Sequence, residues 1–165
     1  MSLLEFFEWL GNTTWSVALL ESLLVYPIVE TTHVLSLTLF LGMIAMLDLR
    51  LVGLTLRDVP VSEVAGRLLP WAVGGFALMV VSGVLLFYSN PVHAFENVFF
   101  RIKMAMLVAA GVNAFVFHTT VYRRVTEWDR APVAPVRARV AGYCSLMLWA
   151  GVVVSGRMQA YNWFD

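Results

Sequence analysis

Four long apolar segments constrain this chain more than any other feature of its sequence. A helix that crosses a bilayer needs about 20 mostly apolar residues, because the hydrocarbon core is about 30 Å thick. Such segments occupy residues 28–52, 70–88, 104–122 and 139–157. Charged residues make up only 13% of the chain, about half the share usual in soluble domains. We therefore predict an all-α integral membrane protein, folded as a single domain with a four-helix bundle.

The segment before the first span, residues 1–26, has a different pattern. It carries three glutamates and no basic residue, and its first apolar residues are spaced as one face of a helix. Thr13 or Thr14 is a suitable N-cap for a second helix. We expect two short interfacial helices that lie on the membrane surface rather than cross it.

Basic residues are distributed unequally between the two sides of the predicted bundle. Four spans place both termini on one side, together with the turn between the second and third spans. The positive-inside rule places the arginine-rich side in the cytoplasm. We therefore expect a multi-pass protein of the bacterial inner membrane with both termini outside, and a net charge of zero leaves no basic face for nucleic acid. The arginine-rich side holds Arg50, Arg57, Arg67, Arg123, Arg124, Arg130, Arg137 and Arg139.

Polar residues in the first span suggest a site near the outer surface. Glu30 and His33 are three residues apart and so share a helix face, and the side predicted to be outside also holds Arg101, Lys103 and Arg157. One interpretation is structural: Glu30 forms a salt bridge with Arg157 or Arg101, and His33 is hydrogen-bonded beside it. The other is a cofactor site, in which the cations bind haem propionates or a quinone carbonyl and His33 ligates iron or donates a proton.

His118, in the third span, is the second candidate metal ligand. The helical rise places it about 12 Å deeper than His33, so one metal ion cannot bind both histidines unless the spans are offset. Each would need another partner, or His118 is a hydrogen-bonded core residue. At the other end of the first span, Asp48 and Arg50 are expected to cap the helix or to pair with charges near Arg57 and Arg67.

The spans resemble those of a family of small bacterial inner-membrane proteins of unknown function. The resemblance runs from about Trp15 to Tyr161. It is carried by YPIVETTHVLSLTLFLGMIAMLDLRLVG, LLPWAVGGFALMVVSGVLLF, FFRIKMAMLVAAGVNAFVFH and SLMLWAGVVVSGR. It implies the four-span fold and brings no activity with it.

A second likeness is to four-helix membrane haem proteins, namely the protoporphyrinogen-oxidase-like and copper-resistance D families. Phe100, Lys103 and the apolar run that ends at His118 are similar to a helix of these families, and His33 is similar to their early histidine. The likeness implies haem b as a cofactor. The first functional hypothesis is a haem-b or quinone-linked electron-transfer protein. The alternatives are a non-enzymatic subunit of a membrane complex or homo-oligomer, and a transporter for copper or another small solute.

Overall fold

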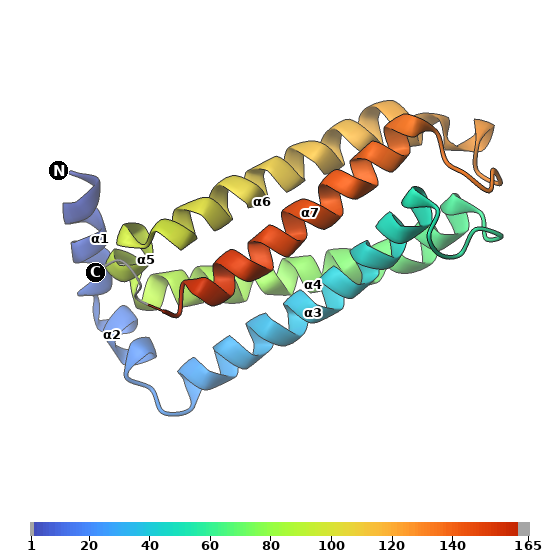
Figure 1. Cartoon of the computed structure of the whole chain (residues 1–165). Helices are drawn as coiled ribbons and strands as arrows, with labels where there is room; N and C mark the ends of the chain where they lie inside the picture. Colours follow the sequence, from blue (N-terminus) through green and yellow to red (C-terminus); the bar gives the residue numbers. More distant parts are fainter. Residues whose placement is uncertain (1, 162–165) are drawn as a thin grey trace.

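The computed structural model describes residues 2–161, and every regular element in that range is helical (Figure 1). Two short helices come first and two helical hairpins follow. The elements are α1 (Leu3–Gly11), α2 (Thr14–Leu20), α3 (Val25–Val52), α4 (Val61–Ser89), α5 (Pro91–Glu96), α6 (Val98–Val116), the π-helical turn η1 (Phe117–Val121), the 3-10 turn η2 (Tyr122–Glu127) and α7 (Val136–Met158).

Four of these helices are long and apolar enough to cross a membrane: α3, α4, α7, and α6 with its continuation to Glu127. The predicted all-α membrane bundle is therefore confirmed. The four long helices begin several residues before the predicted spans. The α4 helix begins at Val61 and contains Pro70. The α6 helix begins at Val98 because the Asn97 side chain accepts hydrogen bonds from two backbone amides of its first turn.

The two short helices lie across one end of the bundle, where the described chain also begins and ends (Figure 1). We call this the terminal end, and the opposite end, with the α3–α4 and α6–α7 connections, the loop end. Thr13 caps α2, as predicted. Its hydroxyl lies 2.6 Å from Tyr88 Oη, and Ser16 Oγ donates to Tyr88 O at 2.7 Å. These bonds hold α2 against the end of α4.

The long helices pack in the order α4, α3, α7, α6, and the ring does not close. Backbone contact is extensive between α3 and α4, α3 and α7, and α6 and α7, but is almost absent between α4 and α6. Two glycines allow the closest approaches. A Cβ at Gly75 would lie 3.2 Å from the backbone of α3, and one at Gly142 would lie 3.1 Å from Asp48 O. Small residues of this kind bring membrane helices together, and the α4–α6 side is left as an open seam.

Candidate functional site

A cavity of about 510 Å³ lies between the four long helices. Its wall is mostly apolar and includes Phe40 on α3, Met79 on α4, Leu107 on α6 and Trp149 on α7. The Phe40 and Trp149 rings meet edge to face, with their centroids 4.7 Å apart. A cavity of this size and composition is typical of sites for small apolar ligands.

The cavity opens sideways through the seam between α4 and α6. Val73 and Phe76 on α4 and Gly111 and Ala114 on α6 all line it, yet these residues are exposed on the surface of the bundle. The seam lies within the membrane-spanning parts of both helices. A molecule dissolved in the hydrocarbon region can therefore reach the cavity without crossing the lipid–water interface.

Asp48 is the charged residue in the cavity wall. Asp48 is only 5% exposed, and Ser145 on α7, which also lines the cavity, is near enough to interact with the carboxylate. The second carboxylate oxygen, Oδ2, is buried without a hydrogen-bond partner. The expectation that Asp48 caps the helix or pairs with an arginine is wrong, because α7 approaches closely at Gly142 and supplies Ser145 instead of a cation.

Two other polar residues of the cavity bond to backbone carbonyl groups. Asn113 Nδ2 donates to Ala141 O at 3.0 Å and so joins α6 to α7. His118 Nδ1 lies 2.9 Å from Ala114 O of its own helix, and its ring meets Phe117 edge to face. His118 lies in the π-helical turn η1, a distortion that is frequent at functional sites.

His33 lies outside the cavity, in the seam between α3 and α4. Its Nδ1 is 3.0 Å from both Met79 O and Ser82 Oγ. The Ser82 hydroxyl donates its hydrogen to Leu78 O at 2.7 Å, so Ser82 can only accept from the ring. Nδ1 therefore carries a hydrogen, and Nε2 of the neutral ring holds a lone pair.

His33 and His118 are not brought together. From the terminal end, His33 is about 12 Å along α3, whereas His118 is about 30 Å along α6 and its continuation. Among the described residues, no group of three or more His, Cys, Asp or Glu side chains could hold a metal ion. A haem that takes both His33 and His118 as ligands does not fit this arrangement.

The three cations of the terminal end bind carbonyl, amide and aromatic groups. Arg101 Nε donates to Phe95 O at 2.9 Å, Lys103 Nζ to Gln159 Oε1 at 3.4 Å, and Arg157 Nη2 to Tyr161 Oη at 3.1 Å. Each cation also lies over an aromatic ring, those of Phe95, Phe100 and Tyr161.

The ion pair predicted between Glu30 and a cation is not formed. Among the described residues, no carboxylate lies within 4.0 Å of Arg101, Lys103 or Arg157. Glu30 is exposed, so burial does not force it to find a cation. Arg157 is exposed as well, and it binds Tyr161, one helical turn further along the chain.

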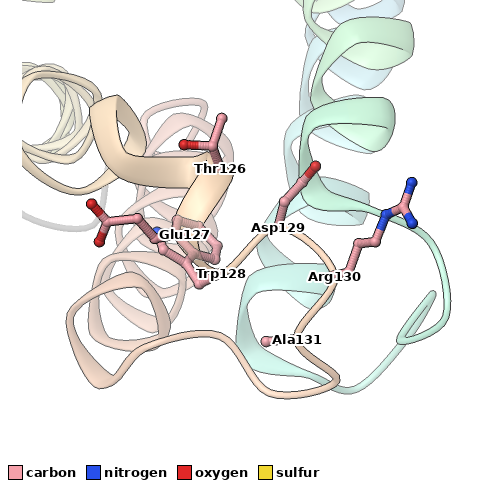
Figure 2. Close-up of a pocket in the computed structure, with 6 residues that line it drawn as sticks. All are labelled: Thr126, Glu127, Trp128, Asp129, Arg130 and Ala131. Atoms are coloured by element: carbon pink, nitrogen blue, oxygen red, sulfur yellow. The ribbon is translucent and has the colours of Figure 1, made fainter.

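A second hollow, of about 320 Å³, lies in the α6–α7 loop at residues 126–131 (Figure 2). Figure 2 shows Asp129 beside the ribbon of α4, with Glu127 and Arg130 directed to opposite sides. The Asp129 carboxylate accepts from Ser62 N and Ser62 Oγ, both at 2.7 Å, and these bonds hold its pKa below the ordinary value of 3.8. Asp129 is thus the N-terminal cap of α4, and this hollow is part of the loop structure.

Over residues 6–162 the sequence matches a family described as a family of unknown function (DUF6644). The match agrees with the predicted resemblance to a family without an assigned activity and adds nothing to the likeness to haem proteins. No curated protein and no solved structure matches the chain.

Proposed function

The chain belongs to this family, which brings no activity with it, and we propose that it binds a lipophilic molecule of the quinol type in the cavity between its four spans. The observation that carries the proposal is the cavity itself, which opens into the hydrocarbon region through the α4–α6 seam. A quinol has an apolar body that suits the wall and hydroxyl groups that donate hydrogen bonds.

Asp48 selects for such a donor. Oδ2 of Asp48 lacks a partner, and an unpaired buried acceptor costs about 1–3 kcal/mol. A hydroxyl that donates to this carboxylate removes that cost. When Asp48 is ionised, this bond is also charge-assisted, which makes it stronger than a bond between neutral groups. Asp48 is the proposed acceptor, and Ser145 is the residue that positions it.

Binding can be measured with a short-chain quinol added to the purified protein in detergent, because Trp149 in the cavity wall reports occupancy by its fluorescence. We expect Asp48→Asn to weaken binding about tenfold, which corresponds to the loss of a charge-assisted bond. Ala114→Phe places a ring in the cavity and should abolish binding. Ala77→Phe adds the same ring to an exposed position of α4 that does not line the cavity, and should leave binding unchanged.

The purified protein and its variants also distinguish the quinol from other possible occupants of the cavity and the seam. Unchanged quinol affinity in Ala114→Phe would overturn the proposal. A Soret band in the visible spectrum of the purified protein would favour haem b, with His118 as its ligand in the cavity. Cross-links between α4 of one copy and α6 of another, together with no quinol binding, would assign the seam to a homo-oligomer.

We also propose that the loop end faces the bacterial cytoplasm, because it holds eight of the basic residues. In a Cys144→Ser background, a cysteine at Thr126 should be protected from a membrane-impermeant thiol reagent added to intact cells. A cysteine at Glu96, at the terminal end, should react. The opposite pattern would reverse the orientation.

A further inference from the structure

The cavity wall contains a histidine as well as Asp48. His118 lies in the turn η1 that continues α6, and it lines the same cavity as Asp48. Ala114, one helical turn earlier, also lines the cavity and is exposed at the α4–α6 seam. His118 is exposed as well, so it lies at the mouth of the cavity, on the side of the loop end.

The hydrogen bond of its ring defines what His118 offers to a ligand. Nδ1 lies 2.9 Å from Ala114 O, and a carbonyl oxygen can only accept. Nδ1 therefore carries the hydrogen, and Nε2 of the neutral ring holds a lone pair. Within residues 2–161, no group donates to Nε2. Because a polar atom without a partner is costly inside a membrane span, this lone pair favours a donor that enters through the seam.

Two aromatic neighbours hold the ring in place. The Phe117 ring meets the His118 ring edge to face with centroids 5.4 Å apart, and the Tyr122 ring lies at 5.3 Å. Phe117 is itself buried in the apolar cluster of the loop end. Nδ1, the ring nitrogen nearer the main chain, is bonded to the helix backbone, so Nε2, at the far edge of the ring, is directed away from that backbone.

Packing brings Asp48 and His118 to the same part of the cavity. Leu47 and Leu51, which lie on either side of Asp48 along α3, belong to one apolar cluster with Phe117, the residue before His118. The two polar side chains come from diagonal helices, because α7 separates α3 from α6 on one side, and α4 with the seam separates them on the other. A ligand in the cavity thus has one acceptor on the buried wall and another at the mouth.

We propose that the cavity binds the two hydroxyls of a quinol separately, one at Asp48 and the other at His118 Nε2. This inference rests on the proposed function and adds to it a second residue in contact with the ligand. The hydroxyls of a quinol lie at opposite ends of its ring, which matches acceptors on diagonal helices. A quinone has carbonyl oxygens in their place and can donate to neither residue, so the site is specific for the reduced form.

Methyl ethers of a quinol test the two contacts, because each methylation removes one donor from the same ring. Tetramethylhydroquinone is symmetric and therefore has a single monomethyl ether. By isothermal titration calorimetry in detergent, we expect the protein to bind the quinol about fivefold more tightly than the monomethyl ether. The hydroxyl that remains binds Asp48, since a carboxylate is the stronger acceptor. The dimethyl ether, which has no donor, should bind more weakly than either.

Variants assign this difference to His118. His118→Phe keeps a ring beside Phe117 and Tyr122 but has no acceptor, so it should bind the quinol and the monomethyl ether equally. Its affinity for the ether should equal that of the wild type. His118→Gln supplies an amide oxygen as an acceptor and should retain part of the preference. Thr119→Val is the control and should keep the full difference, because Thr119 does not line the cavity and its hydroxyl donates to Phe115 O at 2.7 Å.

Failure of the contact at His118 can be told apart from failure of quinol binding. If the wild type binds neither the quinol nor its ethers, the proposed function is wrong, and the contact at His118 is wrong with it. If the wild type binds the quinol and the monomethyl ether equally, or if His118→Phe keeps the difference, quinol binding stands and the role of His118 is wrong. His118→Leu repeats the comparison with a smaller side chain, should His118→Phe not fold.

Discussion

The loop connections and the cavity wall hold two neighbouring charged residues of α3 in different ways. Arg50 is fully buried, and it joins both connections of the loop end by donating to Val59 O at 2.8 Å and to Ala131 O at 3.2 Å, while its Nη1 has no hydrogen-bond partner among the described residues. Asp48, two residues earlier, borders the cavity and, in the described part of the chain, its side chain joins no other segment by a hydrogen bond and its Oδ2 has no partner. From the sequence alone, both residues are expected to cap the end of the helix or to pair with nearby charges.

The difference shows where this protein places its rigid part. At the loop end, charges link segments that are far apart in the sequence, and an apolar cluster that includes Leu51, Val61 and Phe117 packs beside them. At the cavity, the α4–α6 seam is open and Asp48 lies in the wall. We infer that the loop end holds the two hairpins together, so that the seam can remain open without loss of the fold.

The largest expected effect comes from breaking the loop end at Arg50. Arg50→Ala leaves Val59 O and Ala131 O without their donor and creates a void, so we expect the free energy of unfolding to fall by about 3 kcal/mol. Chemical denaturation in detergent measures it. Arg67→Ala is the control, because Arg67 forms only an exposed ion pair with Glu63 at 2.7 Å, and should cost about 0.5 kcal/mol or less. Equal losses would remove the distinction between buried and exposed arginines.

The next effect concerns the closed α3–α4 seam, the counterpart of the open one. Gly75→Ala places a Cβ 3.2 Å from Phe40 N and Ser36 O, which are backbone atoms that cannot move aside. We expect a loss of about 2 kcal/mol. At Gly74, the next residue before it, a Cβ meets nothing within 4 Å, so Gly74→Ala should be neutral or slightly stabilising. The melting temperatures of the Gly75→Ala and Gly74→Ala variants measure this difference. A similar loss of stability in both variants would show that close packing at Gly75 is not what holds α3 against α4.

A smaller effect is expected at Asp129. Because its pKa is lower in the folded protein than in the unfolded chain, its contribution to stability is complete above the ordinary value of 3.8 and is lost as the pH falls through the folded pKa. Asp129→Asn should cost about 1 kcal/mol at pH 7, as loss of a helix cap does. The variant should also lose less stability than the wild type between pH 5 and about pH 3. If the stability of the variant and of the wild type fell by the same amount over this pH range, Asp129 would not be the cap of α4.

The smallest effect is expected at Asp48. Asp48→Asn keeps an acceptor for Ser145 and removes a buried charge with an unpaired oxygen, so we expect a change in unfolding free energy of about zero or a slight gain. Denaturation of the ligand-free protein measures it. A loss as large as that of Arg50→Ala would mean that Asp48 is part of the rigid framework rather than a binding residue.

The helices could be predicted from sequence because each one depends on local properties. Apolar composition defines the four spans, and Thr13 can be recognised from its residue type as the N-cap of α2. The order of the helices around the bundle could not be predicted, because it depends on a few close approaches such as those at Gly75 and Gly142. Without that order, neither the open seam nor the cavity could be inferred.

The candidate site was predictable only in part. The sequence singled out His33, His118 and the three cations, since polar groups are costly in hydrocarbon. It did not identify Asp48, which lies near the end of a span and looks like a capping residue. The signal that could have found it is a second polar residue, Ser145, at a similar depth in the fourth span. The predicted Glu30–Arg157 pair failed because both residues are exposed, where a salt bridge adds little.

The cap of α4 has a consequence for how this protein is made. The backbone amide of Ser62 is bonded by a carboxylate 67 residues later in the chain. When α3 and α4 have left the ribosome for the membrane, Asp129 has yet to emerge from it, and Ala131, the second acceptor of Arg50, follows Asp129. The first hairpin therefore enters the bilayer with the start of α4 uncapped. Asp129 caps α4 only when the second hairpin has entered as well.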